Sequence, residues 1–407
     1  NPSAKYDPDG VGGIINIVLV RGSSDGFNGN ISSMFGERNK QNTNINFNYK
    51  TKITNILVNL NYKKDYKVGD GFRDFIYQYP NKVESINQNT NRIEIPNNLS
   101  FRLGTDYYIN QSSFVGYTLD IAEHKDITKR KFDYILNTVD PNIIGLFQTE
   151  NHDDGFHIDH LVSYENRLTQ YNQLIKAYVS FSYETDDVNE IGNQNITYNP
   201  LQSQNRTEAY ENNNNLTLSI DYESKLKDNF NFEIGSKATI RNFKTELSYL
   251  NTKYINDFSE NIYAAYFFIN YDLPNPLGLK LGFRSEQVNT VAQLSGKSFP
   301  DSSNIITSII DSAIIQSPYN NPYFKLYPNF SILYKINTNQ TVQLGYSKKV
   351  NRPEIGSLSP FPESTQDISR LRNGNPYLKP EFSDIIELKF SSSSKKININ
   401  SNFSLKS

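Results

Sequence analysis

The sequence contains no cysteine, no tryptophan and one methionine in 407 residues. Without cysteine the chain can form neither a disulfide framework nor a thiolate site. Hydrophobic residues make up only 37% of the chain, and the mean hydropathy is −0.60, so the composition does not suit a large soluble core. No apolar run reaches about eighteen residues, and we therefore expect no transmembrane helix.

Strong charge of one sign is also lacking. The chain has 41 basic and 43 acidic residues and a net charge of −2, with both signs dispersed. Nucleic-acid binding needs a basic patch, so we expect no nucleic-acid partner. The sequence has no G-x-S-x-G elbow and no H-E-x-x-H pair, and we expect neither an enzyme nor a cofactor.

What the sequence does have is a strict alternation of apolar and polar residues. The alternation is clearest over residues 216–240, where a short polar turn separates two runs. The apolar positions of these runs are Leu216, Leu218, Ile220 and Tyr222, followed by Phe230, Phe232, Ile234, Ala238 and Ile240. A period of two places the apolar side chains on one face of a strand, and two such runs predict an antiparallel hairpin.

The same pattern recurs from Gly26 to Leu405 and predicts about fifteen wall strands. Every second connection is short, and most of the others are long. The long ones span residues 67–97, 124–155, 185–212, 245–259, 288–327 and 350–381. Short turns on one side and long loops on the other are typical of outer-membrane barrels. Tyrosines at strand ends, such as Tyr62, Tyr107 and Tyr271, suit the membrane interface. The sequence therefore predicts an all-β fold, a transmembrane antiparallel up-and-down β-barrel.

Residues 1–21 differ from the rest. Prolines and glycines mark turns, and residues 14–20 then form a nearly continuous apolar run, which predicts a strand buried on both faces. Asp7 and Asp9 flank Pro8, and we expect them to serve a turn rather than a calcium site.

Two stretches resemble a known family. Residues 1–19, N-P-S-A-K-Y-D-P-D-G-V-G-G-I-I-N-I-V-L, resemble the end of the plug domain in TonB-dependent outer-membrane receptors of Gram-negative bacteria. The matching positions are Pro2, Ala4, Asp7, Gly10, Gly12 and Gly13. Residues 347–355 and 373–382 resemble a barrel segment of TonB-dependent-receptor-like outer-membrane β-barrel proteins. The positions that carry this second match are Arg352, Pro353, Asn375, Pro376, Leu378, Pro380 and Glu381.

The resemblance implies a barrel of about twenty-two strands around an N-terminal plug. On this basis residues 1–22 are the end of the plug and residues 23–407 are an incomplete barrel. We interpret the chain as an internal part of a longer protein, with further strands expected after Ser407.

The resemblance also implies a function, namely uptake of a scarce ligand that the outer loops capture, energised through TonB. The expected partners are outer-membrane lipid, TonB and a small ligand such as a chelate, an oligosaccharide or a peptide. Two alternatives share the barrel: a passive porin-like channel, and a surface adhesin or assembly component that uses the barrel as an anchor.

Three of the four histidines fall within residues 152–160. His152, His157 and Asp159 are the candidate metal ligands, because imidazole and carboxylate groups bind transition metals. Strand parity places His157 and Asp159 on the lumen side and His160 on the other side. We expect a polar rim here rather than a metal site.

Overall fold

The structure is a computed structural model. It describes residues 7–9, 25–79, 82–137, 143–168, 172–196, 199–227, 229–249, 252–273, 276–296, 314, 317–359, 361, 374–393 and 397–407. Nearly all of these residues lie in antiparallel strands of one sheet. No helix in this part of the chain is long and apolar enough to cross a bilayer.

Fifteen strands form the wall, each paired with the next in chain order, as the alternation predicted. They are β1 (Gly26–Gly36), β2 (Lys40–Lys50), β3 (Thr54–Lys64), β6 (Asn97–Tyr108), β7 (Ser113–Asn137), β8 (Ile143–Leu168), β9 (Gln173–Ile196), β10 (Asn199–Lys227), β11 (Phe230–Tyr249), β12 (Thr252–Asp272), β13 (Leu277–Gly296), β15 (Tyr323–Asn337), β16 (Gln340–Asn351), β17 (Glu381–Ser393) and β18 (Asn398–Lys406).

Three further strands and two short helices lie outside this series. They are the hairpin β4 (Lys67–Tyr79) and β5 (Lys82–Ile95), the two-residue strand β14 (Tyr319–Asn320), the 3-10 turn η1 (Glu37–Asn39) and the helix α2 (Ile355–Leu358). The hairpin extends the wall because β5 pairs with the far end of β7.

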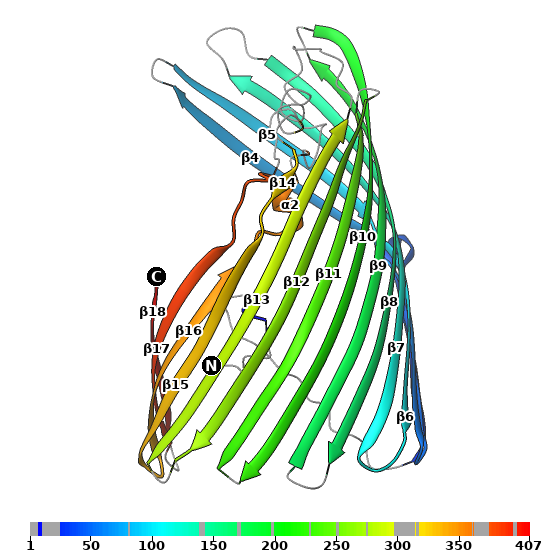
Figure 1. The fold of residues 1–407 in the computed structure, drawn as a ribbon. Helices are drawn as coiled ribbons and strands as arrows, with labels where there is room; N and C mark the ends of the chain where they lie inside the picture. Colours follow the sequence, from blue (N-terminus) through cyan, green and yellow to red (C-terminus); the bar gives the residue numbers. More distant parts are fainter. Residues whose placement is uncertain are drawn as a thin grey trace.

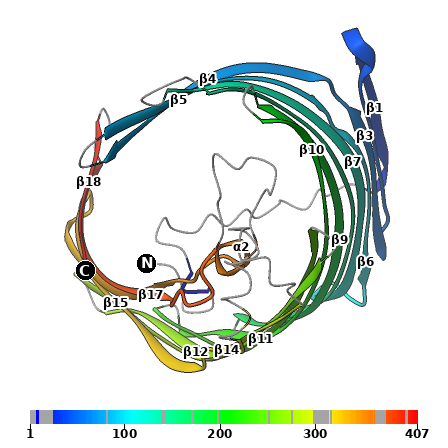
Figure 2. The same cartoon turned by 90° about the horizontal axis from the view of Figure 1, so that it is seen from above.

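Seen from above, the wall curves into an incomplete ring (Figure 2). Its edges among the described strands are β1 and β18, and the sheet is not closed between them. The β4–β5 hairpin leans across this open side, above β18 (Figures 1 and 2). Helix α2 lies inside the ring (Figure 2). The predicted fold class, an antiparallel outer-membrane barrel, is confirmed.

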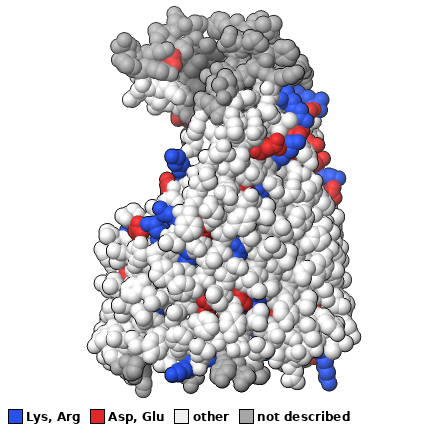
Figure 3. All heavy atoms as spheres, in the orientation of Figure 1, with Lys and Arg blue, Asp and Glu red and all other residues white. Residues whose placement is uncertain are grey.

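The alternation of side chains divides the wall into two faces. On β10 and β11, Ile220 and Ile234 are 54% and 53% exposed on the outer face. On the inner face, Lys237 and Arg284 both contact Asp7 of the N-terminal segment. Much of the wall visible in Figure 3 carries no charge. So much apolar area facing outward would aggregate in water, whereas lipid covers it.

Four of the six predicted long loops, at residues 67–97, 124–155, 185–212 and 245–259, are wrong over most of their length. In the structure β7 continues to Asn137 and β8 begins at Ile143, so both strands extend through the predicted loop. The pairs β9–β10 and β11–β12 also extend through their predicted loops. Residues 67–95 are likewise mostly the β4–β5 hairpin. Apolar residues in these outer extensions, such as Phe132, Ile135 and Phe147, do not keep a period of two, so alternation gives no signal there although the backbone pairing persists. The predicted strand at residues 14–20 lies outside the described residues.

We expect the two faces to respond oppositely to charge. Ile220→Arg places a guanidinium on the lipid face and should reduce the free energy of unfolding by about 2–4 kcal/mol, the cost found near the bilayer midplane. Thr217→Arg, on the lumen face of the same strand, is the matched control and should cost much less. Denaturant unfolding of both variants in liposomes measures the difference; equal losses would contradict the assignment of the faces.

Candidate functional site

The chain turns into the lumen after β16 and returns to the wall at β17. Arg352 and Pro353 directly follow the last residue of β16, and α2 comes next. Backbone hydrogen bonds then join the two ends of this segment: Gly374 N–H donates to Ser359 O at 2.7 Å, and Asn375 N–H donates to Ser357 O at 2.7 Å. These bonds explain how two motifs about twenty residues apart in the sequence come together.

The two motif segments and the wall enclose a cavity of about 250 Å³. Five of the seven motif residues line it, namely Arg352, Pro353, Pro376, Leu378 and Pro380. Of the other two, Asn375 Oδ1 accepts a hydrogen bond from the backbone of Tyr377 at 3.0 Å, and Glu381 pairs with Asn351 where β17 begins. The family-like residues therefore surround one pocket inside the barrel.

Arg352 connects this cavity to the wall and to the N-terminal segment. Its guanidinium donates to the carboxylates of Asp9 and Glu286, and its Nε donates to the hydroxyl of Tyr323 at 3.0 Å. The Arg352 side chain is 10% exposed and that of Glu286 is 1% exposed. A planar guanidinium suits this role because it donates to several acceptors at once.

Arg284, next to Arg352, makes a similar set of contacts with carboxylates. Its Nη2 donates to Asp7 Oδ1 at 2.7 Å, and its Nε donates to Glu286 Oε1 at 2.7 Å. Lys237 Nζ donates to Asp7 Oδ2 at 2.5 Å. We call these six residues, Asp7, Asp9, Lys237, Arg284, Glu286 and Arg352, the lumen cluster. Its three carboxylates balance its three cations, so the charges compensate one another.

The N-terminal segment is also held through its backbone. Val350 N–H donates to Pro8 O at 3.2 Å, and Asp9 forms a parallel bridge with Val350 of β16. Burial raises the pKa of Asp9 above its ordinary value, against the opposing effect of Arg352. Burial acts on Asp7 too, but Arg284 and Lys237 outweigh it and hold the pKa of Asp7 below its ordinary value.

The structure thus gives Asp7 and Asp9 partners that sequence reasoning missed. The expected turn residues pair with lumen cations on β11, β13 and the segment after β16. The sequence does indicate that Lys237, Arg284 and Glu286 face the lumen, because they occupy the polar positions of alternating strands. Only the tertiary arrangement reveals which residues they pair with. The other plug-motif residues, Pro2, Ala4, Gly10, Gly12 and Gly13, lie outside the described residues.

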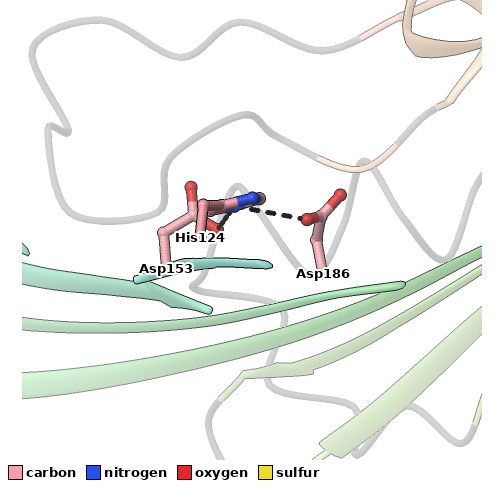
Figure 4. Close-up of side chains that lie close together, drawn as sticks. All are labelled: His124, Asp153 and Asp186. Atoms are coloured by element: carbon pink, nitrogen blue, oxygen red, sulfur yellow. Dashed lines mark hydrogen bonds and ion pairs between the residues drawn. The ribbon is translucent and has the colours of Figure 1, made fainter. Parts of the chain in front are cut away.

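The predicted histidine group is dispersed. His157 Nε2 lies 2.7 Å from Asp159 Oδ2, and His152 Nε2 lies 3.1 Å from Glu150 Oε1. His160 contacts Tyr117 on the outer face, at 2.9 Å from Nδ1 to the hydroxyl oxygen. The cluster that does form contains His124, Asp153 and Asp186 (Figure 4), of which only Asp153 lies in the predicted histidine-rich stretch.

Comparison with known proteins gives a family and a fold. The outer membrane protein beta-barrel family matches residues 166–407. No curated protein matches the sequence. Among solved structures, the copper transporter OprC is similar with a TM-score of 0.57 and 10% identity, over 95% of this chain and 54% of that one. The ferric yersiniabactin uptake receptor FyuA from Yersinia pestis is similar with a TM-score of 0.54 and 11% identity, over 94% and 55%. At these identities the likeness concerns the fold alone, and the chain spans about half the length of either protein.

We expect the lumen cluster to contribute strongly to stability. Arg352→Ala removes one of the two cations that pair with the buried Glu286 carboxylate and should reduce the free energy of unfolding by up to about 3–5 kcal/mol. The control is Arg206→Ala, which removes a 2.7 Å pair with Glu208 in which both side chains are exposed and should cost at most about 1 kcal/mol. Denaturant titration in detergent measures both variants. Equal losses in the two variants would show that the lumen cluster contributes no more to stability than an exposed ion pair.

Proposed function

Because this chain belongs to the outer membrane protein beta-barrel family, we propose that it is part of a gated outer-membrane transporter for a scarce ligand. The predicted family and the integral outer-membrane location are confirmed by the family match and the fold. The two similar proteins are a transporter and an uptake receptor by name, and we propose no catalytic activity for this chain.

The observation that carries the proposal is the lumen cluster, since it ties residues 7–9 to the inner wall through both charges and backbone. In this proposal residues 1–22 are the end of a plug and residues 23–407 are the barrel. A porin needs no segment anchored to its inner wall, whereas a gated transporter needs a part that closes the passage and can be released.

The strength of the anchor bears on how the gate opens. Asp7 and Asp9 are 41% and 44% exposed, so solvent screens their pairs with Arg284 and Arg352. A hydrogen bond to a charged group contributes about 1.5–3 kcal/mol, so breaking both pairs costs about 3–6 kcal/mol. A cost of about 4 kcal/mol reduces a population roughly a thousandfold, because each 1.4 kcal/mol is a factor of ten. Spontaneous release is therefore rare, which favours opening by an external source of energy. We propose TonB as this source, on the basis of the family-like motifs.

Ligand capture is assigned to the outer extensions of the strands and to the rim of the lumen. The inner faces there carry amides and hydroxyl groups, such as Thr149, Asn151 and Thr207. Such groups suit a polar solute, and the proposed ligand classes are a chelate, an oligosaccharide or a peptide.

The gate can be tested with a reversible cross-link in the full-length protein. Asp9 and Val350 are bridge partners, and the sequence has no native cysteine. Asp9→Cys with Val350→Cys should form a disulfide that holds the N-terminal segment to β16. We expect oxidised cells to lose uptake of the labelled chelate, oligosaccharide or peptide that the wild type takes up in a TonB-dependent manner, and reductant to restore it.

Two controls separate the alternatives. Uptake by each single-cysteine variant should be the same under oxidising and reducing conditions, because one cysteine cannot form the cross-link. Liposomes that contain the intact full-length protein should not swell in small sugars, whereas a passive porin would let them swell without TonB. Swelling of these liposomes, or uptake that persists in the cross-linked protein, would refute the gated mechanism.

A further inference from the structure

A histidine and two aspartates converge on the inner face of the wall from three neighbouring strands. His124 lies on β7, Asp153 on β8 and Asp186 on β9 (Figure 4). His124 Nε2 lies 3.4 Å from Asp153 Oδ1 and 3.5 Å from Asp186 Oδ1, and one ligand atom of each residue lies within 4.8 Å of the others. We call these three residues the rim cluster.

The two separations from His124 Nε2 match those of ligands that share one ion. Two ligand atoms about 2.1 Å from a metal in tetrahedral geometry are about 3.4 Å apart. One imidazole nitrogen with two carboxylates is a donor set for a divalent first-row transition metal, because imidazole suits zinc, copper and nickel better than magnesium or calcium. The set leaves at least one coordination position for water or for a ligand group.

A glycine makes the convergence possible. Gly155 of β8 pairs with His124 on one side and with Asp186 on the other, so it lies between them in the same row of the sheet. A Cβ at Gly155 would lie 2.7 Å from His124 Nδ1 and would also clash with the Asp186 carboxylate. The missing side chain therefore leaves a gap that both ligands enter from the neighbouring strands.

Burial and charge around the cluster favour a cation. Asp186 Oδ1 is inaccessible to solvent and has no hydrogen-bond partner in the described part of the chain. Two more carboxylates share this inner face nearby, because Glu211 pairs with Asp186 and Glu184 pairs with His157 in the sheet. Carboxylates outnumber the one imidazole of the cluster, so a bound cation would supply positive charge that the site lacks.

The rim cluster also lies near the outer end of the lumen, where a solute that enters from outside would meet it. On the outer face of β7, the apolar residues Leu119 and Ile121 give way to Glu123 and Lys125, an exposed ion pair at 2.7 Å. The apolar belt of the wall thus ends just below His124. The rim cluster lies above the lipid-covered zone, on the lumen side.

We propose that His124, Asp153 and Asp186 bind a divalent transition-metal ion at the outer rim of the lumen. This site is separate from the lumen cluster, and its existence does not depend on gated transport.

The test is equilibrium binding of Zn²⁺ alone to the full-length protein in detergent, measured by calorimetry. We expect the wild type to bind one Zn²⁺ that excess Mg²⁺ does not displace. His124→Ala and Asp186→Asn should each weaken binding at least tenfold. Gly155→Ala removes no ligand but should weaken binding by a similar factor, because the methyl group pushes the ligands apart.

Matched controls come from the neighbouring histidine pairs. His152→Ala and Asp159→Asn remove groups of the same kind a few residues away and should leave Zn²⁺ affinity unchanged. Circular dichroism confirms that each variant is folded, and His124→Gln replaces His124→Ala if the latter is not. The proposal fails if the wild type binds no Zn²⁺, if rim-cluster variants bind as well as the wild type, or if the controls lose binding equally. Displacement by Ca²⁺ at equal concentration would overturn the assignment to transition metals.

Discussion

The antiparallel hydrogen-bond ladder is the constraint on which the rest of this structure depends. A backbone group without a partner in hydrocarbon costs several kcal/mol, so a chain that crosses the membrane as strands must pair them continuously. Fifteen strands do so here in chain order. The resulting wall is one residue thick, and every side chain must face either lipid or lumen. All the chemistry inside the barrel therefore comes from alternate positions of the strands.

The ladder also aligns these inward positions into rows across the wall. Tyr266 pairs with Arg284, and in the next row Ala264 lies between Lys237 and Glu286. The small side chain of Ala264 leaves room for the longer charged ones to reach inward. Two adjacent rows thus place two cations and a carboxylate close together, and the N-terminal segment and Arg352 complete the lumen cluster. A cluster assembled from rigid strands is preorganised, which makes it a firm anchor.

Sequence reasoning predicted most of this fold because lipid imposes a simple rule on the wall. The alternation at residues such as Leu218 and Ile234 reports directly which face meets hydrocarbon, and it yielded the strand number and the antiparallel order. It failed above the membrane, where the apolar residues of β7 to β10 no longer follow a period of two. It also failed for the clusters, because His124 and Asp186 are 62 residues apart and meet only through the register of three strands. The motif residues around Arg352 were recognisable, but their charged partners were not.

Charge balance distinguishes what the two inner clusters can do. In the lumen cluster three carboxylates meet three cations, so the group is satisfied by the protein itself and resists the entry of another ion. In the rim cluster two carboxylates meet only a histidine, whose charge depends on protonation. The same polar face can therefore anchor a segment at one level and attract a cation at another. A metal ion or a cationic group that arrives from outside would meet the unbalanced carboxylates before it reached the neutral anchor below.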